Sequence, residues 1–279
     1  MSELLKLVEP VLALCASAAE RIVYHYQAPG ADQYQSKDDN SPLTQADVDS
    51  HQILAEGLPS LEGAWPVLSE ESGEDERARR RQWRRFWLID PLDGTREFLE
   101  RTDEFTINVA LIDKHEPAFG VLYEPLKDSA CVGIPGAGAW RYTRCAMGQW
   151  QREPLSCRAL PNSDELVLLA SRRHKNACLD ACMEWLQAGG RRIIRRNSGS
   201  ALKFSELAAG LGDFYPRFSP CCEWDVAAGQ AIVDAAGGGV FGLDGQPLRY
   251  NLSDSLLSPH FYALAEPDHA LWTELWRPG

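Results

Sequence analysis

The feature that most constrains this chain is an acidic segment placed directly after an apolar run. Residues 86–89 read FWLI, and residues 90–95 read DPLDGT. The two carboxylates of Asp90 and Asp93 repel each other unless a cation lies between them, and Mg²⁺ prefers oxygen ligands of this kind. The pattern therefore predicts a strand that ends in a metal-binding turn. The alternative is an ordinary surface turn, because Asp, Pro and Gly are common turn residues.

The residues after this turn suit phosphate binding. The backbone N–H groups that follow Gly94 would begin a helix at Thr95. Unpaired donors and the positive end of a helix dipole favour a phosphate at such a place. We therefore expect a metal site and a phosphate site at the same corner of the fold.

Two further acidic segments occur elsewhere in the chain. Residues 67–72 (VLSEES) are a short apolar strand that leads into Glu70, and α/β folds place ligands at the carboxyl ends of strands. Residues 224–238 (WDVAAGQAIVDAAGG) carry small and apolar side chains at helical spacing, with Asp225 in the first turn. A carboxylate there commonly does no more than cap its helix. The metal interpretation therefore requires Glu70 and Asp225 to approach Asp90.

These segments carry a resemblance to a known family. SPLTQAD (41–47), LSEES (68–72), DPLDGT and WDVAAGQAIVDAAGG, in this order, resemble the signature of the Mg²⁺-dependent, lithium-sensitive phosphatases that include inositol monophosphatases and bisphosphate nucleotidases. The segments at 90–113 and 199–218 look most like the 3′(2′),5′-bisphosphate nucleotidases of the bacterial CysQ type. The resemblance spans nearly the whole chain. It implies a two-lobed α/β fold, an α-β-α-β-α sandwich with the metal site between the lobes.

The resemblance also implies the catalytic centre. It places two or three Mg²⁺ ions at this centre. Their ligands would be the carboxylates of Glu70, Asp90, Asp93 and Asp225 and the backbone carbonyl of Leu92. Glu70, Thr95 and Asp47 would act in catalysis. Thr95, held by Asp47, would orient the attacking water on one Mg²⁺, while a second Mg²⁺ would steady the leaving oxygen. Glu71 would either support Glu70 or be only a charged neighbour.

Substrate selection is expected mainly in the second half of the chain, because a nucleotide with two phosphates needs a second anion site. The residues that would contact the substrate are Glu70, Asp93, Gly94, Thr95, His174, Ser200, Lys203, Arg217 and Asp225. Arginine, lysine and a helix N-terminus suit a second phosphate. The alternatives are that Lys203 and Arg217 are exposed charges and that His174 is structural.

The remaining pattern predicts alternating strands and helices, as in an α/β sandwich. Leu4, Val8 and Leu12 lie at helical spacing among charged residues, which predicts an amphipathic N-terminal helix rather than a signal peptide. Strands are expected at 105–112, 118–123, 130–133, 140–142, 166–170, 193–194 and 213–217, and helices at 177–187, 201–209 and 225–236. Prolines near 153–164 predict a boundary between lobes 1–157 and 158–279.

Charge and composition exclude some classes of protein. A net charge of −12 argues against binding a nucleic acid polymer. The arginine-rich run at 77–85 is expected to be a solvated connector rather than a recognition patch. The chain has no run of about eighteen apolar residues, so no transmembrane segment is predicted. Peripheral membrane contact stays open. The eight cysteines show no zinc spacing and are expected to be reduced thiols.

Three functions remain in play. The first is a phosphatase that removes the 3′-phosphate of adenosine 3′,5′-bisphosphate, with the sulfated nucleotide as a further substrate left open. The second is an inositol or sugar phosphate monophosphatase. The third is a non-catalytic binding module, which would be expected to have lost ligands that this chain retains. We expect the first, in a cytoplasmic monomer or homodimer, with contact to the cytoplasmic face of the inner membrane left open.

Overall fold

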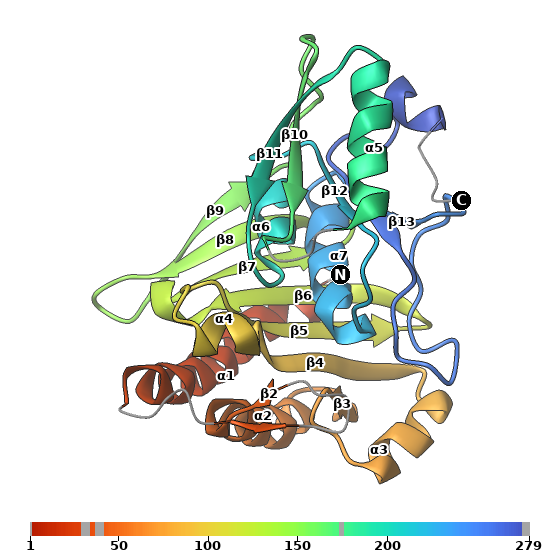
Figure 1. Cartoon of the computed structure of the whole chain (residues 1–279). Helices are drawn as coiled ribbons and strands as arrows, with labels where there is room; N and C mark the ends of the chain where they lie inside the picture. Colours follow the sequence, from red (N-terminus) through yellow and green to blue (C-terminus); the bar gives the residue numbers. More distant parts are fainter. Residues whose placement is uncertain (1, 29–33, 37–41, 173–175, 275–279) are drawn as a thin grey trace.

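The computed structural model describes residues 2–28, 34–36, 42–172 and 176–274, which form stacked α-β-α-β-α layers (Figure 1). Helices α1 (Ser2–Gln27) and α2 (Gln45–Gly57) pack on one face of a seven-stranded sheet. Helices α6 (Leu202–Ala208) and α7 (Glu223–Ala235) lie between that sheet and a five-stranded one. Helix α5 (Ala177–Ala188) forms the last layer. The predicted layered α/β architecture is therefore confirmed.

The seven-stranded sheet follows chain order from β3 to β9, and only β3 and β4 run parallel among its neighbours. Its strands are β3 (Val67–Ser69), β4 (Arg85–Asp93), β5 (Thr106–Asp113), β6 (Glu116–Glu124), β7 (Ser129–Ile134), β8 (Gly138–Arg144) and β9 (Trp150–Leu155). Alternating residues of β4 enter two different cores: Trp87 and Ile89 pack with α1 and α2, whereas Phe86 and Leu88 pack toward α7. Since side chains alternate along a strand, Asp90 belongs to the α7 face.

The five-stranded sheet has the order β11-β10-β12-β14-β13. Its strands are β10 (Glu165–Ala170), β11 (Arg192–Asn197), β12 (Phe214–Arg217), β13 (Gly239–Gly242) and β14 (Phe261–Leu264). Strand β10 runs parallel to β11 and β12, while β12, β14 and β13 are antiparallel neighbours. The remaining elements are short: β1 (Gln35–Ser36), β2 (Pro42–Leu43), α3 (Glu74–Arg79), α4 (Thr95–Leu99) and the 3₁₀ helices η1 (Leu58–Ser60), η2 (Arg80–Gln82), η3 (Pro125–Lys127) and η4 (Ala270–Glu274).

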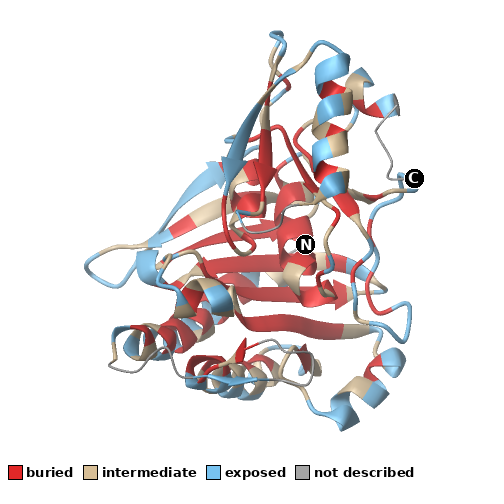
Figure 2. Ribbon diagram, in the orientation of Figure 1, coloured by how far each residue is buried: buried red, intermediate tan, exposed pale blue. Residues whose placement is uncertain are grey.

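Helix α7 is the central buried element (Figure 2). Two glycines of the first sheet allow it to approach. A Cβ on Gly120 would lie 2.4 Å from the carbonyl oxygen of Ala228, and one on Gly133 would lie 2.3 Å from the Cα of Ile232. The absence of a side chain at both positions lets the helix backbone rest directly on β6 and β7. This close packing fixes where the first turn of α7, and hence Asp225, lies.

Most of the elements expected from the sequence are present, with boundaries shifted by a few residues. The structure also has elements that the sequence did not predict, namely β1, β2, β9, β13, β14, α3 and the 3₁₀ helices. The proposed boundary at 157/158 falls between β9 and β10, but α7 from the second half packs on the first sheet. The division into two lobes therefore stays a prediction. Among the described residues, no helix is both long and apolar enough to cross a membrane, and all eight cysteines are unpaired.

The prediction that the arginine run is a solvated connector is wrong for Arg80. This side chain is only 3% exposed, and its guanidinium donates to Asn251 Oδ1 at 2.5 Å and to the carbonyl oxygens of Ser253 and Asp254 at 2.9 and 2.6 Å. A buried guanidinium needs such acceptors because an unpaired buried charge is strongly destabilising. Arg80 therefore joins the β3–β4 connection to the loop before β14. The neighbouring side chain of Arg79 is exposed, as predicted.

Candidate active site

The acidic segment predicted as a turn instead continues β4 as far as Asp93. Asp90 pairs with Asn108 and Asp93 pairs with Thr106, so β4 has one more residue than β5 between these pairs. Residues three apart on a regular strand point to opposite faces, and a bulge with one extra residue re-aims the second side chain. Pro91, which has no N–H to pair, suits this irregularity. The bulge therefore brings both carboxylates to the side facing α7.

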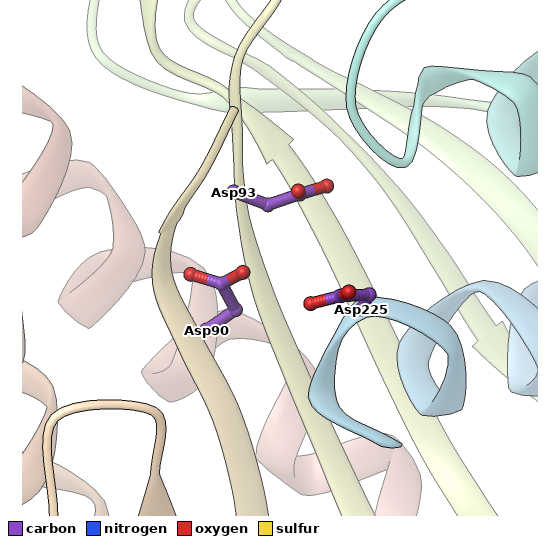
Figure 3. Close-up of side chains that lie close together, drawn as sticks. All are labelled: Asp90, Asp93 and Asp225. Carbon is purple, nitrogen blue, oxygen red and sulfur yellow. The ribbon is translucent and has the colours of Figure 1, made fainter. Parts of the chain in front are cut away.

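Asp225 reaches the same point from the first turn of α7. Carboxylate oxygens of Asp90, Asp93 and Asp225 all lie within 4.8 Å of one another (Figure 3). Asp225 also accepts a hydrogen bond from the N–H of Cys222 at 2.9 Å, which caps the helix. Asp225 therefore caps its helix with one oxygen, and its carboxylate also lies beside Asp90 and Asp93.

Glu70 and Leu92 belong to the walls of the same pocket. Glu70 follows β3, and its N–H donates to the carbonyl of Ile89 at 3.1 Å, which places it beside Asp90. Both Glu70 and Leu92 line a pocket of about 520 Å³ together with the three aspartates. The structure thus assembles all five residues that the sequence suggested as metal ligands around one cavity.

The electrostatics of the cluster show an excess of negative charge. Burial, followed by the charges of Glu70 and Asp93, raises the pKa of Asp90 well above its usual value. Burial, followed by the charges of Asp93 and Glu70, raises the pKa of Asp225 to about 8. Carboxylates in such a place favour either a proton or a cation. Because every donor here is an oxygen, the set fits a hard divalent cation.

Thr95 and Asp47 are in contact next to this cluster. The Thr95 hydroxyl donates to Asp47 Oδ1 at 3.1 Å. Asp47 Oδ2 accepts the backbone N–H of Thr44 at 2.7 Å and its hydroxyl at 2.6 Å, which caps α2. Burial, together with the charges of Glu71 and Glu70, raises the pKa of Asp47 to about 7 despite the two bonds from Thr44. Thr95 is therefore held by a carboxylate whose own orientation is set by a helix cap.

A second, smaller pocket adjoins the first. It measures about 120 Å³ and is lined by Gly94, Ser200, Lys203 and Arg217 as well as by Asp93 and Asp225. Lys203 is only 2% exposed, so the alternative that it is a surface charge is wrong. Its ammonium group donates to the carbonyl oxygens of Ser198 and Ser200, and burial, helped by the charge of Arg217, lowers its pKa to about 8.

Two of the other predicted substrate contacts lie at the second pocket, and a third is not described by the structure. Arg217 lines the second pocket and donates to the carbonyl oxygens of Ser219 and Pro220 at 3.2 and 3.1 Å. Ser200 donates its hydroxyl to Asp93 Oδ2 at 2.6 Å, which ties the second pocket to the acidic cluster. His174 lies outside the described residues.

Three residues near the site were not among the site residues predicted from the sequence. Arg77, expected to be solvated, donates to the carbonyl oxygens of Glu70 and Ser72 at 2.6 and 3.0 Å, and its guanidinium carbon lies 5.5 Å from the ring centre of Trp224. Thr106 and Asn108 are buried polar side chains on β5. A signal was present for this pair, because they alternate with Ile107 and Val109 in an apolar strand.

Comparison with known proteins agrees with the geometry. The sequence model described as the inositol monophosphatase family matches residues 4–274. The 3′(2′),5′-bisphosphate nucleotidase CysQ of Escherichia coli is 38% identical over 255 residues, which are 91% of this chain and 98% of that protein. The protein of the same name from Buchnera aphidicola is 34% identical over 265 residues, which are 93% of this chain and 94% of that protein.

Solved structures show the same fold. The crystal structure of CysQ from Bacteroides thetaiotaomicron, a bacterial member of the inositol monophosphatase family, has a TM-score of 0.80 and 34% identity and covers 93% of this chain and 97% of that one. The inositol monophosphatase from Anabaena has a TM-score of 0.67 at 21% identity, with 96% and 93% of the two chains covered, and supports the fold alone. The resemblance read from the four sequence segments is thus confirmed, and the chain belongs to the inositol monophosphatase family.

Proposed function

We propose that this protein is a magnesium-dependent phosphatase that removes the 3′-phosphate of adenosine 3′,5′-bisphosphate to give AMP and phosphate. The observation that carries the proposal is the convergence of Asp90, Asp93 and Asp225, with carboxylate oxygens within 4.8 Å of one another, beside a second pocket that holds Lys203 and Arg217. The relatives named as bisphosphate nucleotidases, at 38% and 34% identity, support the same substrate class.

The proposed ligands are the carboxylates of Glu70, Asp90, Asp93 and Asp225 and the carbonyl of Leu92. These five residues all line one pocket. Two or three magnesium ions bound there would supply positive charge that activates a water molecule and stabilises the leaving oxygen. The oxygen donors support a hard divalent cation over a soft one. The raised carboxyl pKa values of Asp90 and Asp225 support the binding of positive charge at this place.

Thr95 and Asp47 would prepare the attacking water. Since the Thr95 hydroxyl donates to Asp47, its oxygen keeps lone pairs that can accept a proton from a water molecule. The Thr95 proton can then pass to Asp47. Burial raises the pKa of Asp47 to about 7, which suits a group that accepts protons near neutral pH.

Lys203 and Arg217 would favour a substrate with a second phosphate. Both line the pocket of about 120 Å³, which shares Asp93, Gly94 and Asp225 with the larger pocket. The arginine presents a fork of donors that matches phosphate oxygens. A monophosphate such as inositol 1-phosphate would fill the acidic pocket without using this second group of cations.

The test compares adenosine 3′,5′-bisphosphate, its 5′-phosphosulfate analogue and inositol 1-phosphate at equal Mg²⁺. We expect the bisphosphate to have the highest kcat/KM. Arg217→Met should lower kcat/KM for the bisphosphate about ten- to a hundredfold, the loss expected for a charged hydrogen bond, and leave inositol 1-phosphate nearly unchanged. Arg192→Met, on the exposed side of β11, is the matched control. A preference for inositol 1-phosphate in the unmodified protein would refute the substrate assignment.

A further inference from the structure

Two buried polar side chains of β5 lie beneath the acidic cluster and have no part in the steps above. Thr106 and Asn108 are both 0% exposed, and they pair with Asp93 and Asp90 across the bulge. Thr106 Oγ1 lies 2.7 Å from Asn108 Oδ1 and 2.8 Å from Ser200 Oγ, and Ser200 Oγ lies 2.6 Å from Asp93 Oδ2. The four side chains thus form a continuous row of hydrogen-bonding contacts that ends at the Asp93 carboxylate.

The number of protons in this row does not match the number of contacts. The amide oxygen at one end can only accept, and so can the carboxylate at the other end when it binds a cation. The two hydroxyl groups of Thr106 and Ser200 supply one proton each, but the row has three contacts. One pair of oxygens would therefore face each other at hydrogen-bond distance with no hydrogen between them. Meanwhile the amide nitrogen of Asn108 is buried with no partner in the described structure.

Reversing the Asn108 amide removes both problems at once. The oxygen and nitrogen of an amide are nearly the same shape, so their assignment follows from the hydrogen bonds around them. With its nitrogen toward Thr106, Asn108 donates to Thr106, Thr106 donates to Ser200, and Ser200 donates to Asp93. All three contacts then carry a proton. The amide oxygen takes the unpartnered position, and a buried acceptor without a partner is less unusual than a buried donor without one.

We propose that Asn108, Thr106 and Ser200 form a row of hydrogen bonds that are all donated in the direction of Asp93. This row, called the relay below, orients the Asp93 carboxylate for cation binding and transfers no proton. Asn108 and Thr106 are then positioning residues, which act through Asp93. Ser200 acts in the same way rather than by donating its proton to the nucleotide. Successive donors polarise one another, so the last bond to Asp93 is strengthened. The inference rests on the proposed cation site, because it assigns the groups that aim one of its ligands.

The relay also connects the first sheet to the loop between β11 and α6. Asn108 and Thr106 belong to β5, whereas Ser200 precedes α6, next to the five-stranded sheet. Ser200 has a left-handed backbone with φ of 47°, and the buried Lys203 binds its carbonyl oxygen. The N–H of Ala201 also donates to Asp93 Oδ2, at 2.6 Å. Oδ2 of Asp93 therefore accepts two hydrogen bonds, both from the loop that precedes α6.

The amide orientation is tested without metal or substrate. A crystal structure of the unmodified protein near 1 Å resolution distinguishes the amide oxygen from the nitrogen by bond lengths and visible hydrogens. We expect the nitrogen of Asn108 to face Thr106. An oxygen in that position would overturn the proposal.

The function of the relay is tested with Thr106→Val, which keeps the shape of the side chain but removes the hydroxyl, and with Asn108→Leu. Outer partners of metal ligands typically change metal affinity by about 10–100-fold when they are lost. Addition of Mg²⁺ should raise Tm in each protein. We expect both variants to need about 10–100-fold more Mg²⁺ than the unmodified protein to reach half of the maximal increase in Tm. Thr106→Ser should restore the requirement of the unmodified protein. Thr143→Val, exposed on β8, is the control for the same substitution away from the site.

Tm without metal shows whether each variant is folded. If Thr106→Val is folded and its Mg²⁺ requirement is within about twofold of the unmodified protein, the relay does not orient Asp93 for cation binding. These readouts do not depend on which phosphate ester is hydrolysed. An unmodified protein that binds Mg²⁺ but does not cleave adenosine 3′,5′-bisphosphate would therefore contradict the proposed function and leave the test of the relay intact.

Discussion

Asp47 illustrates how one side chain can serve both the fold and the site. Its Oδ2 accepts the backbone and hydroxyl donors of Thr44 and thereby caps α2, while its Oδ1 accepts the hydroxyl of Thr95. The pattern SPLTQAD indicated the contact with Thr95 only through the family resemblance. The cap explains it physically, because two donors on one oxygen leave the other oxygen aimed in a fixed direction.

Asp47→Asn is expected to lower kcat without unfolding the protein. The donors of Thr44 would hold the amide oxygen, so the amide nitrogen would face Thr95. Thr95 would then accept instead of donate, and its proton would have no carboxylate to receive it. Loss of a proton acceptor typically reduces the rate by about 10²–10⁴-fold. The measurement is kcat at saturating Mg²⁺, with Tm as the control. A kcat equal to that of the unmodified protein would exclude Asp47 from proton transfer.

At the scale of elements, the site depends on a bulge in β4 and on the position of α7. The apolar run before DPLDGT predicted the strand, but the sequence did not show that the strand continues through Asp93 with one extra residue. Helix α7 was expected from its periodicity. Its placement against β6 and β7 was not, because it depends on Gly120 and Gly133 meeting a helix more than ninety residues later in the chain.

Gly133→Ala is expected to move α7 and weaken the site at a distance. A methyl group there would lie 2.3 Å from the Cα of Ile232, which is backbone and cannot rotate away. Overpacking of this kind typically lowers the free energy of unfolding by about 1–3 kcal/mol. Because α7 carries Asp225, the Mg²⁺ requirement should also rise. Chemical denaturation and Mg²⁺ titration measure the two effects. Gly189→Ala, at the end of α5, is the control, and equal behaviour of the two variants would contradict this role of the contact.

At the scale of the whole molecule, the acidic cluster gathers charge from distant parts of the chain into a buried place. Burial and neighbouring charges raise the pKa of Asp225 from 3.8 to about 8. A group with a raised pKa binds a proton more tightly in the folded protein, so its contribution to stability is present below about pH 4 and is lost as pH rises toward 8. Repulsion among the active-site carboxylates should therefore destabilise the metal-free protein near neutral pH.

The metal-free protein is accordingly expected to lose Tm between about pH 4 and 8, and Mg²⁺ should restore much of the loss by binding the ionised carboxylates. Asp225→Asn removes one of the repelling charges. It should raise the metal-free Tm at pH 8 relative to the unmodified protein, and this difference in Tm should shrink as the pH falls toward 4. Thermal unfolding at several pH values, with and without Mg²⁺, measures this. A metal-free Tm at pH 8 that is lower in Asp225→Asn would contradict the electrostatic account.

The amino-acid sequence alone determined most of the elements, because periodicity and turn chemistry are local, and it indicated the candidate ligands through the family resemblance. It indicated DPLDGT, Glu70 and Asp225 as acidic positions at the ends of elements, and their order revealed the family. Only the tertiary structure decided which of these groups meet. The burial of Lys203, the inward Arg77 and Arg80, and the row from Asn108 to Asp93 depend on contacts between residues far apart in the chain. Local patterns carry little information about such contacts, since each partner has a plausible solvent-exposed alternative on its own.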